Sequence, residues 1–236
     1  MSLPFDLDTA RKTLADAVSG ADDGEIYVEQ TRSESFVFDD GRLKSAAFDT
    51  GQGMGLRVVA GEATGFSHGS ELSDDAIRRA GETAAAAKRG YSGELAEGPR
   101  PINRRLYDPI DPTESPDFGV KTSLLAEIDA YARAKDPRVV QVSASIAGSH
   151  KHVTIVRPDG AVFEDVRPLV RVNVSVTMEK DGRRESGSAG AGGRAAYEEW
   201  IAPDRWKGLV ERAMKKAETN LESIPTPAGE MEVVLG

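Results

Sequence analysis

The segment Val170-Arg-Val-Asn-Val-Ser-Val-Thr-Met178 decides the fold class of the region around it. Apolar and polar side chains alternate strictly along this segment, so one of its faces can be buried while the other stays exposed. A helix would need apolar residues spaced three and four positions apart, and this segment does not supply them. The segment therefore predicts a β-strand with one buried face.

The residues after this strand predict a hairpin. Asp181-Gly182 suits the positive φ values of a tight turn, so we expect the chain to pair back through residues 183–193. Glycine recurs in this returning strand, although it weakens strands and occurs mostly where a strand bends or another backbone comes close.

Two interpretations of the glycine-rich strand remain open. It is either a bent hairpin end or a backbone surface to which an extended peptide adds as a further strand. In the second case, arginines beside the glycines would contact acidic side chains or a terminal carboxylate. The candidate peptide-contacting residues are Arg183, Arg184, Ser186, Gly187, Ser188, Gly190, Gly192, Gly193 and Arg194.

Strand patterns between helical patterns occur twice along the chain. They predict an α+β protein of two consecutive domains, each an antiparallel sheet flanked by helices. We place the first domain at residues 1–90 and the second at residues 118–228. Five prolines interrupt residues 91–117, which we interpret as a linker, and residues 229–236 are expected to begin a strand of a further domain.

Composition excludes several classes of protein. The 236 residues carry a net charge of −9, which argues against direct binding to nucleic acid or to an anionic membrane. The chain contains no cysteine, which excludes disulfides, thiolate metal sites and a cysteine nucleophile within it. No apolar run approaches the roughly 20 residues that span a bilayer, which argues against a transmembrane helix. The first residues also lack the basic and apolar regions of a signal peptide, so we expect a cytoplasmic protein.

Three short motifs are weak evidence for chemistry. Gly51-x-Gly-x-Gly55 leads into a strand rather than a helix, which disfavours a nucleotide loop and suggests a closely packed strand entry. His150 and His152 lie on one face of a predicted strand, but a metal site would need a third ligand. Ser186 and Ser188 do not match the Gly-x-Ser-x-Gly motif of serine hydrolases.

Several longer motifs, in order along the chain, resemble one known family. They are Asp49-Thr-Gly-Gln-Gly-Met-Gly-Leu-Arg-Val-Val59, Gly61-Glu-Ala-Thr-Gly-Phe66, Asp165 to Val176, Glu179 to Arg194 and Pro227 to Gly236. Together they resemble the TldD subunit of the TldD/PmbA metallopeptidases, which are also called modulators of DNA gyrase. The resemblance covers nearly the whole chain.

The resemblance implies a cytoplasmic zinc peptidase that acts on extended or unfolded peptides, including peptide precursors and an antitoxin. It also implies a dimer, commonly with a sister subunit of the family, that encloses the peptide. The family's zinc ligands come from a His-Glu-x-x-x-His motif and a later cysteine, with the glutamate as general base. This chain has neither, so we expect no zinc and no catalytic residue in it.

This departure leaves three expectations to be tested. The first is that the chain is the N-terminal and central part of such an enzyme, inactive alone, with the zinc motif encoded soon after Gly236. The second is a stand-alone peptide-binding or dimerisation module, and the third is an inert folded fragment.

Overall fold

The computed structural model describes residues 5–97, 106–225 and 228–234. Its strands are β1 (Asp23–Asp39), β2 (Arg42–Ala60), β3 (Ala63–Gly69), β4 (Val139–Val156), β5 (Val162–Lys180) and β6 (Arg183–Gly193). Its helices are α1 (Leu7–Val18), α2 (Asp74–Ala85), the short 3-10 helix η1 (Ala86–Lys88), α3 (Phe118–Lys135), α4 (Tyr197–Trp200) and α5 (Pro203–Leu221). The α+β class is confirmed.

The six strands form one antiparallel sheet in the order β3-β2-β1-β4-β5-β6. We expected a separate sheet in each half of the chain, and the structure corrects this expectation. β1 of the first half pairs with β4 of the second, from Ile26 opposite Val156 to Asp39 opposite Ser143. The two edges that would have ended separate sheets therefore satisfy each other's main-chain hydrogen bonds.

The predicted turn at Asp181-Gly182 is confirmed. Asp181 and Gly182 have φ values of 52° and 78°, as a two-residue hairpin requires, and Lys180 lies opposite Arg183. Asp40 and Gly41 repeat this geometry between β1 and β2, with φ values of 49° and 77°. The two tight turns allow neighbouring long strands to pair along their length.

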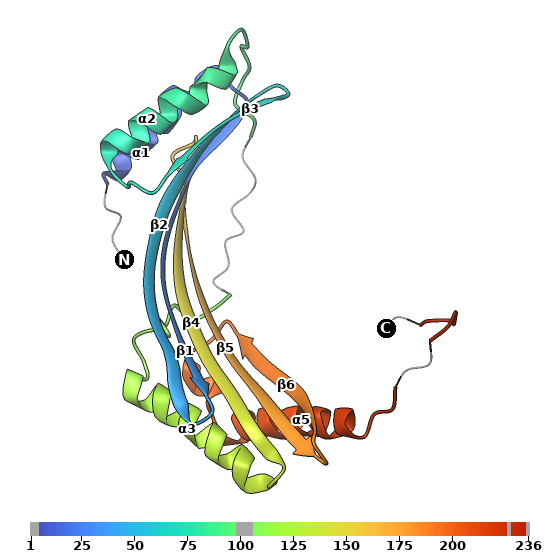
Figure 1. Ribbon diagram of the computed structural model, residues 1–236. Coiled ribbons are helices and arrows are strands. Elements are labelled where there is room, and N and C mark those ends of the chain that lie inside the picture. The colour runs from blue at the N-terminus through green and yellow to red at the C-terminus, as the bar shows by residue number, and fades with distance from the viewer. Residues whose placement is uncertain (1–4, 98–105, 226–227, 235–236) are drawn as a thin grey trace.

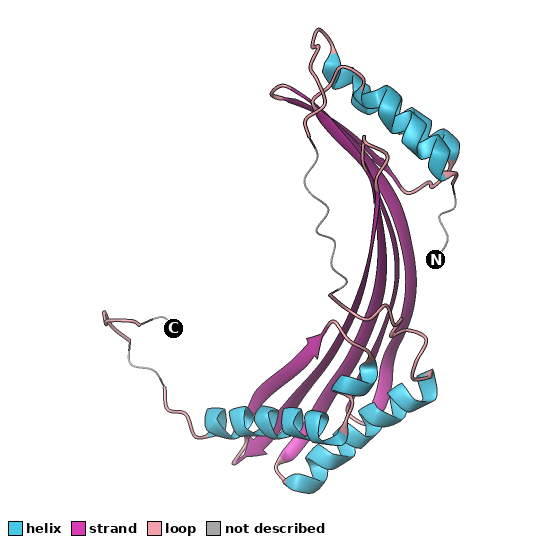
Figure 2. Cartoon of the chain, turned by 180° about the vertical axis from the view of Figure 1, so that it is seen from behind, coloured by secondary structure: helices cyan, strands magenta, loops and turns pink. Residues whose placement is uncertain are grey.

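The sheet is strongly curved, and the helices lie on its convex side at the two ends (Figures 1 and 2). At one end α1 and α2 cover a cluster of buried residues that includes Ile26 and Leu56. At the other end α3 and α5 cover a second cluster that includes Phe36 and Val174. The concave face carries no helix among the described residues.

The strands are longer than the sequence pattern predicts. β1 runs without interruption through Glu29–Ser33, where apolar alternation fails, because neither face of the sheet meets a helix layer there. The proposed strand after residue 229 is not present, since residues 228–234 lie outside helices and strands and are exposed. Residues 98–105 of the expected linker, and the ends at 1–4 and 235–236, lie outside the described residues.

Candidate functional site

The concave face of the sheet contains the largest of the hollows described here, of about 810 Å³. Its floor is the run Gly51, Gly53 and Gly55 of β2, whose positions all face the concave side because they are opposite Thr31, Glu29 and Tyr27 of β1. A Cβ atom on Gly51 would have no other atom of the described residues within 4 Å. At Gly53 the nearest atom is the carbonyl oxygen of Gly69, at 3.3 Å.

The glycines of β2 therefore have a different role at each position. We expected a closely packed strand entry, and this is confirmed only at Gly55, where a Cβ would lie 3.0 Å from the ring of Phe66. Gly51 and Gly53 instead leave the main chain of β2 open to solvent. The absence of side chains at these two positions creates the depth of the hollow.

Aromatic rings form one wall of this hollow. Phe66 and His68 project from β3 on the concave face, with ring centroids 5.6 Å apart and planes 26° apart. Phe66 is 60% exposed, so most of its ring surface is available to a ligand.

A polar network forms the opposite wall. The hydroxyl of Tyr27 donates to Glu29 at 2.7 Å, and the ammonium of Lys151 lies 2.9 Å from the same carboxylate. Burial, together with the hydrogen bond to Glu29, raises the pKa of Tyr27 to about 12. Burial alone would raise the pKa of Glu29, but hydrogen bonds from Lys151 and Tyr27 outweigh it and hold the pKa below its ordinary value.

The pKa of Tyr27 gives a direct test of this network. Since the folded value of about 12 exceeds the ordinary 10, the network stabilises the folded state below pH 10, and this contribution is lost as the pH rises through 12. Subtracting the ultraviolet pH titration of Tyr27→Phe from that of the wild type should reveal one tyrosine ionising near 12. A difference curve centred at 10 would show that Tyr27 is freely solvated.

A second hollow, of about 440 Å³, adjoins the first towards the middle of the concave face. The two share Ser33 and Asp49 in their lining. Small side chains, including Ser35, Ala47 and Ala147, line the second hollow. Among the described residues, the concave face is thus hollowed from β3 to the centre of the sheet.

The predicted residues of β6 do not form one site. Ser186, Ser188, Gly190 and Gly192 are on the concave face, opposite Thr177, Ser175, Asn173 and Arg171, whereas Gly187 and Gly193 are on the helix side. A Cβ on Gly187 would lie 2.2 Å from the carbonyl oxygen of Ala213 in α5, and one on Gly193 would lie 2.6 Å from Trp200. These two glycines allow close packing inside the chain.

Side chains of α5 also occupy part of the outer edge of β6. Lys216 donates to the carbonyl oxygen of Ser188 at 2.9 Å, and Asn220 donates to that of Ser186 at 3.0 Å. An incoming strand would have to displace both donors. A hollow of about 350 Å³ remains between Ser186–Ser188 and α5.

The predicted arginines have partners within the chain. Arg183 donates to the carbonyl oxygens of Asn220 and Ser223 at the end of α5, and Arg184 pairs with Glu179. The guanidinium of Arg194 lies 5.1 Å from the ring centroid of Tyr107. The three cations therefore point to different parts of the structure.

The described parts of the chain contain no group of three His, Asp or Glu side chains that could hold a metal ion. His150 and His152 lie on the convex side of β4, opposite Arg32 and Gln30, while His68 is on the concave side of β3. Nδ1 of His150 is 3.5 Å from Asp111, and burial lowers the pKa of His152. A catalytic zinc site needs about three converging protein ligands, and these residues do not fit one.

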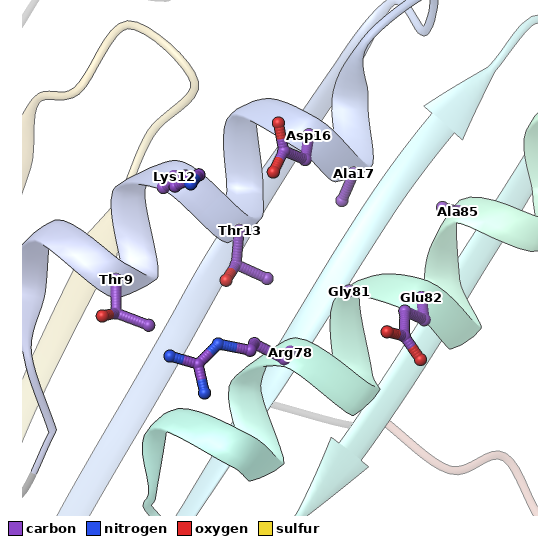
Figure 3. Close-up of a pocket in the computed structure, with 9 residues that line it drawn as sticks. All are labelled: Thr9, Lys12, Thr13, Asp16, Ala17, Arg78, Gly81, Glu82 and Ala85. Atoms are coloured by element: carbon purple, nitrogen blue, oxygen red, sulfur yellow. The ribbon is translucent and has the colours of Figure 1, made fainter.

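A further hollow, of about 540 Å³, lies between α1 and α2 (Figure 3). The helices approach closely here, since a Cβ on Gly81 would be 2.7 Å from Cγ2 of Thr13. Charged side chains of both signs, Lys12, Asp16, Arg78 and Glu82, line it. We interpret it as the surface groove between two packed helices.

Comparison with known proteins identifies the family. Residues 24–88 match the model of PmbA/TldA metallopeptidase domain 1, and residues 111–221 match that of the central domain. The chain therefore belongs to the PmbA/TldD metallopeptidase family.

No helix among the described residues has the length and apolar character needed to cross a membrane.

Two curated relatives are metalloprotease TldD homologs, from Buchnera aphidicola of Schizaphis graminum and from Haemophilus influenzae, and each is 36% identical to this chain. Each match covers 91% of this chain and 46% of the relative, so the chain spans about half the length of these proteins.

Solved structures agree on the fold. A modulator of DNA gyrase from Thermotoga maritima superposes with a TM-score of 0.71 at 19% identity, over 94% of this chain and 50% of that one. TldE from Thermococcus kodakarensis gives 0.65 at 16% identity, over 90% and 47%.

Proposed function

We propose that this chain is the substrate-holding part of a zinc metallopeptidase that cleaves extended or unfolded peptides, in peptide maturation or antitoxin degradation. The observation that supports the proposal best is the open concave face, with its glycine floor and adjoining hollows. An extended peptide presents main-chain groups along its whole length, and a floor without side chains lets them come close to β2.

The walls of the first hollow favour a peptide over a compact ligand. The exposed ring of Phe66 offers an apolar surface to one side chain, and Glu29 with Lys151 offers charges of both signs on the opposite wall. These groups are spread along the strands rather than converging on one point. Such a surface suits a chain of varied sequence.

The chemical step is proposed for the whole protein, which would carry the zinc that generates the attacking hydroxide. The His, Asp and Glu side chains of the described residues do not fit a zinc site. We therefore assign the zinc ligands and the general base to residues outside the two matched domains. The chain by itself is expected to hydrolyse no peptide. Its share of the reaction is to hold the substrate in extended form.

We also propose that the working enzyme is cytoplasmic and pairs this chain with a second family subunit. The fold shared with TldE from Thermococcus kodakarensis supports a like-folded partner. The net charge of −9 supports peptides rather than nucleic acid as the ligand.

Filling the glycine floor should weaken peptide binding without unfolding the chain. The Cβ of a Val at Gly51 would meet no atom of the described part of the chain within 4 Å, so Gly51→Val should fold, yet its side chain would occupy the space of an incoming backbone. We expect at least about a tenfold loss of affinity for a fluorescein-labelled unstructured peptide of roughly ten residues, measured by anisotropy.

Thr50→Val is the matched control, since Thr50 is exposed on the same strand but faces the convex side. It should bind the peptide like the wild type. Equal affinities for all three proteins would contradict the proposed site.

A stand-alone binding or dimerisation module remains the alternative function for this chain. A gene that stops at Gly236 without any zinc motif would favour this alternative.

A further inference from the structure

Arg171 of β5 lies on the concave face without a carboxylate partner among the described residues. Its Nε atom donates to Oδ1 of Asn173 at 3.0 Å, and its two terminal nitrogens have no acceptor in the described part of the chain. Three other arginines on the concave face form ion pairs: Arg57 with Glu25, Arg167 with Asp165, and Arg184 with Glu179. A chain with a net charge of −9 therefore leaves the guanidinium of Arg171 without a counterion among these residues.

Neighbouring strands hold this guanidinium in place. Asn173, which accepts from Arg171, donates in turn through Nδ2 to Oγ of Ser145 on β4 at 3.4 Å. Gly190 of β6 supplies the space, since a Cβ there would collide with Oδ1 of Asn173 and lie 2.9 Å from Nη2 of Arg171. The side chain is thus ordered before a ligand arrives, which reduces the entropy that binding costs.

The surroundings of Arg171 suit a carboxylate that belongs to an apolar or extended residue. Leu169 is two positions earlier on the same face of β5 and is 46% exposed. Lys216, which donates to the carbonyl oxygen of Ser188 at 2.9 Å, adds a second cation beside β6 and has no carboxylate partner among the described residues. A guanidinium presents its N–H groups as a fork that matches the two oxygens of a carboxylate.

We propose that Arg171 binds a carboxylate of the peptide substrate, while Leu169 contacts the apolar part of the residue that carries it. The inference rests on the proposed function, and it adds a polarity, because the negative group of the peptide lies at β5 and β6. Asp49, on the β2 side of the second hollow, has no cationic partner among the described residues and repels that group. The carboxylate is either the C-terminus of the peptide or an acidic side chain.

The position of Arg171 favours the substrate over another part of the protein as the source of this carboxylate. Arg171 lines the second hollow, which continues into the hollow above the glycine floor. A peptide that extends from that floor across the second hollow therefore meets Arg171 on the same face. The three paired arginines find their carboxylates on their own or the next strand, whereas neutral side chains hold Arg171 and leave its charge available.

Three fluorescein-labelled peptides of one neutral, unstructured sequence test the proposal on the wild-type chain. One ends in a free carboxylate, one ends in an amide, and one ends in an amide but carries a single internal glutamate. We expect a peptide with a carboxylate to bind about tenfold more tightly than the neutral amide in anisotropy titrations. Tighter binding of the free acid alone assigns the C-terminus, and tighter binding of the glutamate peptide assigns an acidic side chain. Equal affinity for all three peptides overturns the proposal.

Arg171→Gln should abolish this preference and keep the affinity for the neutral amide, since Arg171 is exposed and its loss leaves the core intact. Arg184→Gln is the matched control, because it removes the same charge from the concave face of the next strand, where Glu179 already neutralises it. This control should keep the preference of about tenfold. Equal loss of the preference in both variants would show a response to net charge alone and overturn the assignment to Arg171.

The same titrations separate this inference from the proposed function. Equal affinities that Gly51→Val weakens would leave the proposed function standing and remove only the carboxylate site, whereas no binding of any peptide would overturn both. In a longer protein that contains this chain, the same preference is expected. A preference that the chain shows and the longer protein lacks would mean that a carboxylate of the protein itself occupies Arg171, and it would overturn the proposal.

Discussion

Replacing Lys121 by methionine is expected to lower the free energy of unfolding by about 3–5 kcal/mol. The ammonium of Lys121 lies 2.6 Å from the carboxylate of Glu34, and both side chains are 2% exposed. It also donates to the carbonyl oxygen of Pro112 at 3.3 Å and lies 4.7 Å from the ring centroid of Tyr197. Lys121→Met would leave a buried carboxylate without its cation. Urea unfolding followed by circular dichroism would measure the change.

Two further variants distinguish the loss of the Glu34–Lys121 ion pair from general damage to the core. Replacing both partners, as Glu34→Leu with Lys121→Met, removes both buried charges and should recover most of the loss. Lys44→Met removes a cation that is 57% exposed and paired with Asp39, and it should cost at most about 1 kcal/mol. Equal effects of Lys121→Met and Lys44→Met would show that the Glu34 pair is solvated.

Adding a methyl group at Gly187 should destabilise the chain by about 3 kcal/mol, the upper end of the usual range for overpacking. Its Cβ would lie 2.2 Å from the carbonyl oxygen of Ala213 and 2.4 Å from the amide nitrogen of Ala217. Both are main-chain atoms of α5, so relief requires the helix to move away from β6. Thermal unfolding of Gly187→Ala would measure the loss.

Gly51→Ala is the control for Gly187→Ala, since both substitutions add one methyl group to a glycine within a strand. At Gly51 the methyl group meets open space, so the change in stability should stay within about 0.5 kcal/mol. A stable Gly187→Ala protein with weakened peptide binding would contradict the packing role and favour the original interpretation of Gly187 as a peptide contact.

Local chemistry accounts for the parts of the fold that the sequence predicts well. The alternation at Val170–Met178 and the turn at Asp181-Gly182 both depend on neighbouring residues. The pairing of β1 with β4 joins residues more than a hundred positions apart, and no local pattern encodes it. For that reason two sheets were expected and one was found.

The glycines also show that local sequence does not predict which distant residues a position will meet in the fold. Sequence indicates that glycine is needed, but not whether a neighbouring backbone or empty space lies above it. At Gly187 it is the backbone of α5, and at Gly51 it is open space. The spacing of two places all three glycines of β2 on one face of a strand, but it does not indicate that a hollow lies above Gly51 and Gly53.

The separation of the two buried clusters has a mechanical consequence. Between them, β1 carries Gln30 and Arg32 on its convex side, so main-chain hydrogen bonds and polar contacts such as the ion pair of Arg32 with Asp111 take the place of apolar packing there. Bending a ladder of such bonds by a small angle exposes little apolar surface, whereas shifting either helix layer would open a core. We therefore expect the sheet to bend at its middle, so that its concave face widens or narrows around peptides of different bulk while the helix-covered ends keep their packing.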